Sequence, residues 1–313
     1  MLVFRSPAEV PDGFGPSVVA VGKFDGVHAG HRAVLDRARA DAAGTAKVVA
    51  VTFDRNPLAV LRPDACPPSL TGVPQKLELL AETGIDAVLV LTFDRDLADL
   101  EPERFVDAVL GPLGMRTILV GGDFRFGRGG VGTPQLLAEL GAARGFTVDV
   151  IDDVRARAGE RRVSSTWVRE ALADGDIATA TRLLGRAPSV WGEVVHGLKR
   201  GRELGFPTAN LGGRTAGVAP ADGVYAGWLL VREPGGDHRY PAAISVGTNP
   251  TFDDVDQRQV EAYVLDEHGL DLYGASVEVQ FTARIRGMVA FDGIDALIER
   301  MTADVAEVRA ILA

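Results

Sequence analysis

The sequence predicts two domains: an α/β domain built on a parallel β-sheet, followed by a small antiparallel β-barrel that ends in a helix. Three observations lead to this fold class. The length of 313 residues suits two domains of about 100–200 residues each. The first half alternates apolar runs with helical stretches, and the second half consists mainly of strands. We expect the domains to span residues 1–185 and 186–313.

In the first half, short apolar runs alternate with helical stretches. The runs expected to be strands are Val18–Val21, Val48–Phe53, Ala87–Thr92, Thr117–Val120 and Thr147–Ile151. The stretches expected to be helices are Gly30–Ala43, Pro74–Glu82, Pro102–Leu110 and Thr133–Arg144. Strands that are apolar along their whole length indicate a parallel sheet covered on both faces. Ligands of such sheets bind beyond the carboxyl ends of the strands.

The pattern changes after Ser164. Two short helices are expected over Ser165–Ala173 and Ile177–Leu184. The strands that follow are expected at Val190–Val195, Val224–Val231, Tyr240–Val246, Gln259–Leu265 and Ser276–Ile285. In the last of these, apolar and polar residues alternate, which is typical of a half-buried strand. A closing helix carries its apolar residues, from Ile294 to Leu312, on one face.

Composition argues against several classes of protein. There are 33 Lys and Arg residues against 43 Asp and Glu, and a formal net charge of −10 argues against a nucleic-acid scaffold. The single cysteine, Cys66, precludes an internal disulfide and a multi-thiolate metal site. The N-terminus lacks a signal-peptide pattern, and no apolar run approaches the roughly 18–20 residues that span a bilayer. We therefore expect a cytoplasmic protein without nucleic-acid or membrane partners; no sequence feature specifies an oligomeric state.

A glycine-rich turn between a strand and the first long helix is the first candidate site. The segment Val21–His31 includes Gly22 and Gly26, which let the backbone turn tightly and approach a ligand. The helix that follows offers free N–H groups and a partial positive charge suited to phosphate. His28 and His31 are three residues apart, so both imidazoles lie on one side of the first helical turn.

Three interpretations of this histidine pair compete. Either histidine can be an ordinary packed side chain. The pair can also bind a metal, for which Asp25 is the only nearby third ligand. The third interpretation is anion stabilisation, with imidazole donors aimed at the charge that develops on a transferring phosphoryl group. We favour the third because of a second segment at the start of another helix.

That second segment is Arg161–Arg169, which combines hydroxyl and guanidinium groups. Ser165, Thr166 and Arg169 suit the binding of a triphosphate. A plain capped helix is the alternative interpretation, because Ser and Thr favour N-cap positions. Together with the histidine pair, the functional interpretation is the better one.

These segments resemble a known family. Gly22–His31, with the pattern GxFDGxHxGH, and Ser164–Arg169, with the pattern SSTxxR, resemble the HxGH nucleotidyltransferases. Together with Val51–Asp54 and Gly122–Gly127, they resemble the FMN adenylyltransferase half of the bacterial bifunctional riboflavin kinase/FAD synthetases. The resemblance implies a Rossmann-like first domain that acts as a nucleotidyltransferase.

A basic, glycine-rich stretch near the start of the barrel domain is the second candidate site. Gly201, Gly205 and Lys199 lie in it, and the residues Pro-Thr-Ala-Asn follow. In an extended segment, residues two apart face the same side, so Thr208 and Asn210 can meet one hard cation. Mg²⁺ prefers few protein oxygens together with water and nucleotide phosphates. A Gly-rich hairpin with a polar turn is the alternative, but it does not explain why these features occur together.

This stretch resembles the riboflavin kinase motif of the same bifunctional family. Further matches extend to the end of the chain at Gly223–Gly227, Ser245–Phe252, Val260–Asp266 and Asp271–Gly274. The resemblance implies ATP-dependent phosphorylation of riboflavin to FMN in the barrel, then adenylylation of FMN to FAD and pyrophosphate in the α/β domain. It implies Mg²⁺ with ATP, riboflavin and FMN as small-molecule substrates, and FMN and FAD as products rather than redox cofactors.

The resemblance also assigns roles to residues of the first domain. The catalytic residues that would stabilise the α-phosphate are His28 and His31. The nucleotide-binding residues would be Gly22, Phe24, Asp25, Gly26, Ser165, Thr166 and Arg169, the last three on the pyrophosphate. The residues near the flavin would be Asp123, Phe124 and Phe126.

In the barrel domain, the resemblance assigns Mg²⁺ and the ATP phosphates to Thr208 and Asn210. Glu261 would accept the proton of the riboflavin 5′-hydroxyl; without the resemblance it is an ordinary strand residue. Nucleotide binding is assigned to Lys199, Gly201 and Gly205, within a candidate lid at Gly197–Gly205.

Two departures from the family pattern affect the first site. Arg55-Asn56-Pro57 stands where the family often has Pro-His-Pro, which leaves Asn56 one hydrogen-bond donor in place of an imidazole. Asp123 stands where some members carry Asn.

Three alternatives to the bifunctional enzyme remain: one active module only, an RNA-binding protein, and a non-catalytic flavin sensor. The net charge and the lack of a KMSKS-like segment disfavour the second, and the intact Pro-Thr-Ala-Asn and Glu261 disfavour the third.

Overall fold

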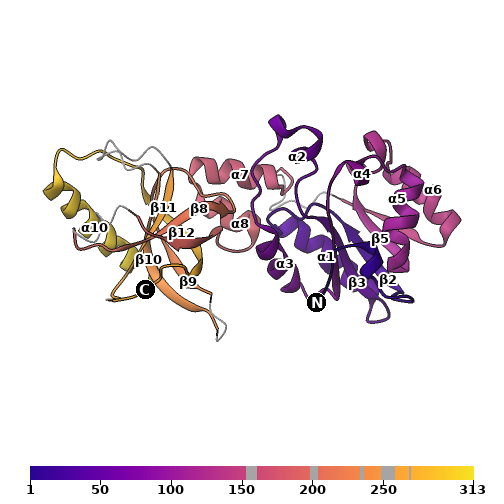
Figure 1. Cartoon of the computed structure of the whole chain (residues 1–313), viewed down its shortest axis with the longest axis horizontal. Coiled ribbons are helices and arrows are strands. Elements are labelled where there is room, and N and C mark those ends of the chain that lie inside the picture. Colours follow the sequence, from indigo (N-terminus) through magenta and orange to yellow (C-terminus); the bar gives the residue numbers. More distant parts are fainter. Residues whose placement is uncertain (153–160, 198–203, 233–235, 248–257, 268) are drawn as a thin grey trace. The chain divides into compact units, whose positions relative to one another are not determined.

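A computed structural model describes residues 1–152, 161–197, 204–232, 236–247, 258–267 and 269–313. The chain divides into two compact units (Figure 1): Met1–Ser69 with Val73–Ser164, and Leu70–Gly72 with Ser165–Ala313. The two helices that follow Ser164 therefore group with the barrel. The functional division between residues 185 and 186 stays a prediction.

The first unit is a six-stranded parallel sheet in the order β1-β4-β3-β2-β5-β6. Its strands are β1 (Leu2–Phe4), β2 (Ser17–Val21), β3 (Lys47–Phe53), β4 (Ala87–Leu91), β5 (Met115–Gly121) and β6 (Thr147–Ile151). Its α-helices are α1 (Ala29–Ala42), α2 (Leu58–Leu61), α3 (Val73–Ala81), α4 (Arg95–Ala98), α5 (Pro102–Phe105) and α6 (Pro134–Arg144). After β2 the chain runs to β3 and β4 on one side and then crosses to β5 on the other. Ligands of open α/β sheets bind at such a switch point, so the turns after β2 and β5 are where a site is expected.

Apolar side chains cover both faces of this sheet. Val18 of β2 is fully buried in one core with Leu35 of α1 and Leu80 of α3. Its neighbour Val19 is fully buried in the other core with Leu137 of α6. The parallel sheet with helices on both faces, predicted from the uninterrupted apolar strands, is confirmed.

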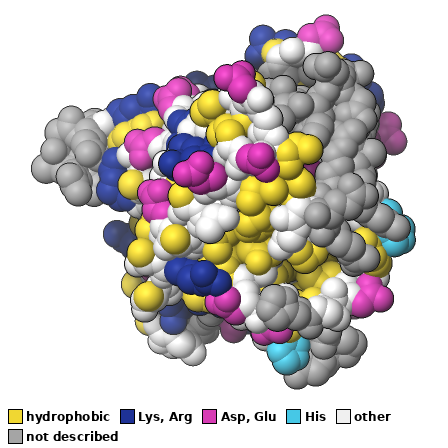
Figure 2. All heavy atoms as spheres, turned by 90° about the vertical axis from the view of Figure 1, so that its left-hand side faces the viewer, with side chains coloured by type: hydrophobic (Ala, Val, Ile, Leu, Met, Phe, Trp, Pro, Cys, Tyr) yellow, Lys and Arg dark blue, Asp and Glu magenta, His cyan; other side chains and the backbone are white. Residues whose placement is uncertain are grey.

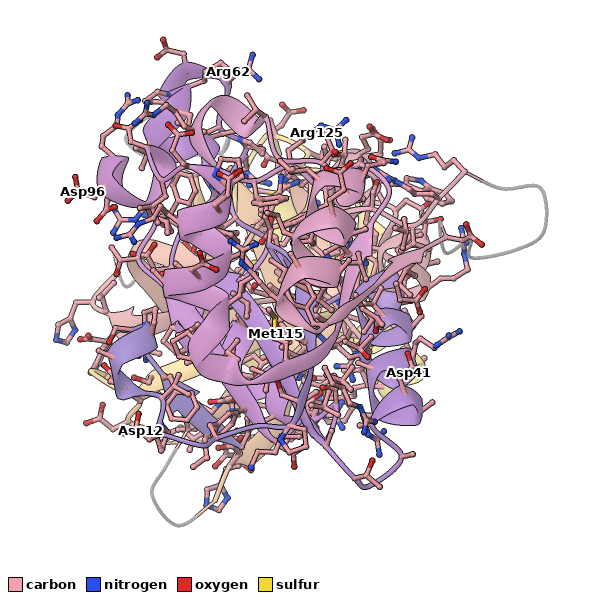
Figure 3. All side chains as sticks on the ribbon, turned by 90° about the vertical axis from the view of Figure 1, so that its right-hand side faces the viewer. Asp12, Asp41, Arg62, Asp96, Met115 and Arg125 are labelled. Atoms are coloured by element: carbon pink, nitrogen blue, oxygen red, sulfur yellow. The ribbon has the colours of Figure 1, made fainter. Side chains whose placement is uncertain are left out.

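The charged residues of the first unit lie mostly on its outside (Figure 3). Arg62, Asp96 and Arg125 are exposed and project away from the ribbon. Met115, at the start of β5, lies among packed side chains and borders one of the cores. Exposed ion pairs contribute little to stability, so the two apolar cores are the main support of the sheet.

The second unit is a closed antiparallel barrel of six strands in the order β10-β11-β8-β7-β12-β9. The strands are β7 (Ser189–Val195), β8 (Thr208–Ala216), β9 (Gly223–Val231), β10 (His238–Gly247), β11 (Gln259–Val264) and β12 (Ser276–Arg286). The helices are α7 (Ser165–Asp174) and α8 (Ile177–Leu184) before the barrel and α10 (Ile294–Leu312) after it. Tyr225 and Phe281 are fully buried and meet edge to face with ring centroids 5.4 Å apart.

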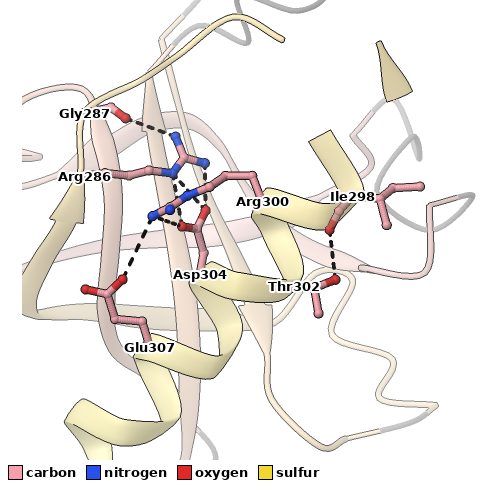
Figure 4. A network of polar contacts seen from close by, with 7 residues as sticks. All are labelled: Arg286, Gly287, Ile298, Arg300, Thr302, Asp304 and Glu307. Atoms are coloured by element: carbon pink, nitrogen blue, oxygen red, sulfur yellow. Dashed lines mark hydrogen bonds and ion pairs between the residues drawn. The ribbon is translucent and has the colours of Figure 1, made fainter. Parts of the chain in front are cut away.

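An apolar contact and a buried ion pair fix the terminal helix α10 to the barrel (Figure 4). Val308 is fully buried in a cluster with Ala226 of β9. Asp304 is 3% exposed. It accepts a hydrogen bond from Nη2 of Arg286 on β12 at 2.7 Å and lies 2.8 Å from Nη2 of Arg300, one turn earlier on the helix. The position of α10 therefore depends on a carboxylate that two guanidinium groups share.

Apolar side chains also reach the surface of the barrel unit. Val289 and Ile294, before and at the start of α10, are more than half exposed. Figure 2 shows one face of this unit, on which apolar side chains form a patch among charged ones. Contiguous apolar surface is typical of ligand or partner sites. Within the described ranges, no helix is both long and apolar enough to cross a membrane.

The fold class is confirmed, and several elements differ from prediction, among them the short helices α2 and α4, which are not among the expected helices. The strand β8 (Thr208–Ala216) was not among the expected strands, and its glycines explain why it lacks an apolar pattern. The edge strand β1 (Leu2–Phe4) has three residues, too few to show a period. The helix expected over Pro102–Leu110 consists of the short helix α5 and a π-helical segment, Val106–Leu110.

Candidate active sites

The turn between β2 and α1 has a strained backbone anchored by two buried apolar side chains. Phe24 and Val27 have positive φ angles of 47° and 39°, and both are almost fully buried. Positive φ is rare outside glycine and a genuine outlier for a β-branched residue. Gly26, at φ 81°, takes the same region without strain. Because the Phe24 ring is in the core, only the backbone of this turn and its polar side chains can face a nucleotide.

His28 and His31 lie together at the start of α1, as the spacing predicts. His28 is the N-cap, and its Nδ1 accepts the backbone N–H of His31 at 3.2 Å. The two imidazole rings stack with centroids 3.6 Å apart. A Cβ at Gly30 would lie 3.2 Å from the His28 ring, so this glycine leaves space for it. Since Nδ1 of His28 is an acceptor, the proton of the neutral ring is on Nε2, which can donate to a ligand.

The environment of His31 keeps its ring neutral. Burial, followed by the charges of His28, Lys76 and Lys23, holds the pKa of His31 well below its usual range. Its Nδ1 atom is buried and has no hydrogen-bond partner among the described residues. A buried polar atom without a partner favours a ligand over a purely structural role. Of the three interpretations of the histidine pair, this favours anion binding.

Lys76 of α3 is a residue of this site that sequence analysis did not single out. It lies at a buried helix position, and its ammonium group reaches the carbonyl oxygens of Lys23 and Phe53. The signal was present in the sequence, because Val73 and Leu80 share the same helix face and an apolar residue is expected between them.

The loop after β5 meets the same edge of the sheet, because β2 and β5 are neighbouring parallel strands. Asp123 is exposed and pairs with Arg162, with Nη2 and Oδ2 2.9 Å apart. Phe124 and Phe126 stack with ring centroids 5.5 Å apart. Phe126 is 6% exposed and packs on Phe105 in the core, so Phe124 is the more accessible of the two rings.

Asn56, which stands where the family often has a histidine, makes a hydrogen bond within its own loop. Its Oδ1 accepts the backbone N–H of Leu58 at 3.1 Å, which supports the start of α2. Its amide NH₂ remains the donor available to a ligand.

Ser165, Thr166 and Arg169 occupy the first two turns of α7. This helix belongs to the second unit, whereas the histidine pair belongs to the first. The assignment of these three residues to pyrophosphate stays a prediction.

In the barrel, Thr208, Asn210 and Glu261 form one cluster. The strands β8 and β11 pair so that Asn210 lies directly opposite Glu261, and Thr208 lies two residues from Asn210 on the same face. The Thr208 hydroxyl donates to Oε2 of Glu261 at 3.4 Å. Nδ2 of Asn210 donates to Oγ1 of Thr208 at 3.2 Å, which leaves Oδ1 as the oxygen that a cation could use. The structure therefore brings the three residues of the second candidate site together.

These oxygens suit a cation that also binds nucleotide phosphates. They comprise two neutral oxygens and one carboxylate, and the described residues contain no cluster of three or more His, Cys, Asp and Glu. Such a set cannot form an all-protein cage, but it fits the few protein ligands that Mg²⁺ takes beside phosphates and water.

Burial raises the pKa of Glu261, and the hydrogen bond from Thr208 opposes this in part. A carboxylate with a raised pKa is a stronger base than an exposed one, which suits proton acceptance from a hydroxyl. The backbone of Gly197 approaches the same cluster, since a Cβ there would lie 2.6 Å from Cγ of Asn210. Gly205 adopts φ 88°, a conformation that favours glycine. Lys199, Gly201 and most of the candidate lid lie outside the described residues.

The fold and the two side-chain clusters suit a transferase that acts on phosphate groups, with one cluster in an α/β unit and one in a barrel. The comparisons with known proteins agree. The family model for FAD synthetase matches residues 12–167, and that for riboflavin kinase matches residues 184–312. The chain belongs to the bifunctional riboflavin kinase/FMN adenylyltransferase family.

Individual relatives cover almost the whole chain. The bifunctional riboflavin kinase/FMN adenylyltransferase of Escherichia coli is 38% identical over 92% of this chain and 90% of its own length. The protein of that name from Listeria monocytogenes is 36% identical over 95% of this chain and 92% of its own length. A crystal structure titled macrolide-efflux protein from Streptococcus pneumoniae superposes with a TM-score of 0.84, at 29% identity and 98% coverage of both chains.

Proposed function

We propose that this enzyme makes FAD from riboflavin in two ATP-dependent steps, one in each predicted domain. The barrel converts riboflavin and ATP to FMN and ADP. The α/β domain then converts FMN and a second ATP to FAD and pyrophosphate. The observation that carries the proposal is that each unit holds its own cluster of polar side chains, with the histidine pair in one and Thr208, Asn210 and Glu261 in the other.

In the kinase step, the riboflavin 5′-oxygen attacks the γ-phosphorus, the bond to the β-phosphate oxygen breaks, and ADP leaves. Glu261 accepts the hydroxyl proton, and its raised pKa supports this role. Thr208 and Asn210 would hold Mg²⁺ and orient the ATP phosphates. Bound there, the cation would neutralise the charge that builds up on the phosphate oxygens.

Two features support the remaining assignments in the barrel. Gly205 and the close approach of Gly197 to Asn210 favour a backbone that folds near the phosphates. We assign nucleotide binding to Gly205 with Lys199 and Gly201. The apolar patch on the face of this unit offers a surface of the kind that a planar flavin ring needs.

In the adenylyl-transfer step, a phosphate oxygen of FMN attacks the α-phosphorus of ATP, the bond to the β-phosphate breaks, and pyrophosphate leaves. The His28 Nε2–H and the neutral His31 ring stabilise the charge on the α-phosphate. We assign the phosphates of the nucleotide to the backbone of the turn and to α7, through Gly22, Phe24, Asp25, Gly26, Ser165, Thr166 and Arg169. Little covalent chemistry is asked of the protein, so positioning and charge neutralisation supply most of the catalysis.

The flavin end of this second site is assigned to the loop after β5. Phe124 offers its ring, and Phe126 supports it from the core. The Asp123 carboxylate would repel the FMN phosphate, and its ion pair with Arg162 reduces that repulsion.

The test is an incubation of the purified protein with riboflavin, ATP and Mg²⁺, followed by chromatography with fluorescence detection. FMN that appears first and FAD that follows would establish both activities and their order. FMN alone would mean that the α/β unit is inactive, and attention would turn to Asn56 and Asp123. Flavin binding without conversion would identify a sensor and refute the enzyme. The variants E261Q and H28N, given riboflavin or FMN, assign each activity to its unit.

A further inference from the structure

Lys76 is the feature of the first unit that the proposed roles leave unexplained. It is only 7% exposed. Its Nζ donates to the carbonyl oxygens of Phe53 at 2.8 Å and Lys23 at 3.3 Å, and no carboxylate of the described residues forms an ion pair with it. Burial lowers the pKa of Lys76, while the charges of Asp25 and Asp54 act in the opposite direction. A buried ammonium group satisfied by backbone carbonyls is energetically expensive, so its presence calls for a reason.

The two carbonyls that Lys76 contacts belong to the ends of two neighbouring strands. Phe53 is the last residue of β3, and Lys23 follows β2 by two residues. The Lys23 carbonyl also accepts a hydrogen bond from Oγ1 of Thr52 at 2.9 Å. Thr52 has no exposed surface. Two buried donors from different elements therefore fix this one carbonyl, at the carboxyl edge where the site lies.

The fixed carbonyl is the start of the strained turn. Phe24 comes next, at φ 47°, and Val27 follows at φ 39°. Residues persist in such conformations only where their surroundings over-determine them. His28 directly follows Val27, so the position of its ring, and of the stacked ring beside it, depends on this backbone.

We propose that Lys76 is a positioning residue of the adenylyltransferase site, and that it presents His28 and His31 to the α-phosphate by holding the strained turn through the Lys23 carbonyl. The inference rests on the proposed function of the α/β unit. Lys76 acts through the backbone and touches no substrate. Thr52 is its partner in the same task, because both donate to one oxygen.

The charge of Lys76 has a second effect on the site. His31 is stacked on His28 and faces the charges of Lys76 and Lys23, which together with burial keep its pKa low. Removal of the Lys76 charge is therefore expected to raise the pKa of His31. The chain has five histidines, few enough for their ring protons to be followed by NMR.

The test compares K76M, K76R and T52V with a matched control, K47M. Lys47 also lies on this sheet and donates to a backbone carbonyl, that of Phe14 at 2.6 Å, but at the amino end of β3. For K76M, kcat for FAD formation from FMN and ATP should fall by about 10- to 100-fold, as when side chains that orient a catalytic group are lost. T52V should show a smaller loss of the same kind, and K47M none. FMN formation from riboflavin, measured on the same preparations, should be unchanged.

The outcomes separate this inference from the proposed function. If the wild-type chain makes no FAD from FMN, the proposed function fails. If the wild type makes FAD and K76M does so at the wild-type kcat, the inference about Lys76 is wrong. Equal loss of FAD and FMN formation in K76M would also overturn it, because the role would then be purely structural. If K76M does not fold, the T52V variant provides the test. Loss of FAD formation with normal FMN formation in T52V supports the proposal, and unchanged FAD formation refutes it.

The pKa of His31 gives a readout that a merely structural role would not move. It should rise in K76M and return toward the wild-type value in K76R, which restores the charge. An unchanged His31 pKa in a folded K76M protein would contradict the electrostatic part of the proposal.

Discussion

Nδ1 of His28 accepts the backbone N–H of His31 at 3.2 Å, and the same two residues stack their rings 3.6 Å apart. One hydrogen bond thus caps the helix and fixes the tautomer, which places the remaining N–H of His28 on Nε2. The structural and chemical tasks of His28 lie on different nitrogen atoms. Substitution can therefore separate them.

Asparagine and alanine at position 28 provide this separation. Asn is among the best N-cap residues, so H28N should keep the stability of the helix, whereas H28A should lose about 1 kcal/mol. Both lack the Nε2 donor, and adenylylation of FMN should fall by roughly 10²- to 10³-fold in both. Thermal unfolding and FAD formation measure the two effects, with FMN formation as the control. Wild-type FAD formation by H28N would contradict the assigned role.

Replacement of Glu261 by Gln is expected to abolish FMN formation and to leave adenylylation of supplied FMN intact. As the pH is lowered, the wild-type rate of FMN formation should begin to fall at a higher pH than it would with an exposed glutamate as the base. The reason is that the base works deprotonated and that burial raises the pKa of Glu261. The measurement is a pH profile of kcat/KM. A decline only near the ordinary Glu pKa would argue against Glu261 as the base.

The same raised pKa has a consequence for stability. The folded state binds the Glu261 proton more tightly than the unfolded state. The protonated Glu261 side chain therefore stabilises the fold fully at pH values below its pKa in the unfolded state. This stabilisation is lost as pH rises through the folded pKa. E261Q removes this dependence, and we expect it to unfold at a higher temperature than wild type near neutral pH. An E261Q protein less stable than wild type at pH 7 would refute this.

Gly197→Ala tests the close approach of the backbone to Asn210. A methyl group there would lie 2.6 Å from Cγ of Asn210 and must displace its amide. We expect a higher KM for Mg·ATP in FMN formation and normal adenylylation. Gly293→Ala is the control, because no atom lies within 4 Å of a Cβ at that position. Equal kinetics for the two variants would show that the crowding has no effect on the site.

Because Arg286 and Arg300 share the Asp304 carboxylate, we expect D304A and R300A to lower the stability of the barrel unit by different amounts. D304A leaves the largely buried guanidinium of Arg286 without its carboxylate partner and should destabilise the barrel unit by about 3–5 kcal/mol. R300A removes the more exposed partner and should cost about 1 kcal/mol or less. All three tryptophans, Trp167, Trp191 and Trp228, lie in the second unit, so fluorescence during urea unfolding reports that unit alone. Similar midpoints for the two variants would contradict the buried role of Asp304.

The fold was largely predictable because its signals are local. The strand expected over Thr147–Ile151 has those bounds, and those expected from Val18 and Val48 begin one residue earlier. Side-chain periodicity did not reveal β8, whose Gly212 carries no side chain. It pairs with β7, the strand directly before it, and with β11, which follows β8 only after two further strands.

The candidate sites were predictable where residue type and spacing carry the chemistry. The histidine pair and the Thr208–Asn210 pair each depend on a short local spacing, and both come together as expected. Glu261 needed the family resemblance, because only the register of β11 brings it opposite Asn210. For Lys76 the sequence shows only a lysine on the apolar face of a helix, and its partners could not be predicted because they are backbone carbonyls.

The closed barrel determines how rigidly the kinase residues are held. The strand β8 pairs with β7 on one side and β11 on the other, and Asn210 is paired on both sides, with Val195 and Glu261, whereas Thr208, the first residue of β8, pairs with Tyr263 of β11. At the edge of an open sheet, a glycine-rich strand of this kind would fray readily. In a ring without an edge, its amide protons exchange with solvent only when the barrel itself opens. We therefore expect the amide proton of Asn210, which is paired on both sides, to exchange slowly, so that its backbone geometry is set before any substrate arrives.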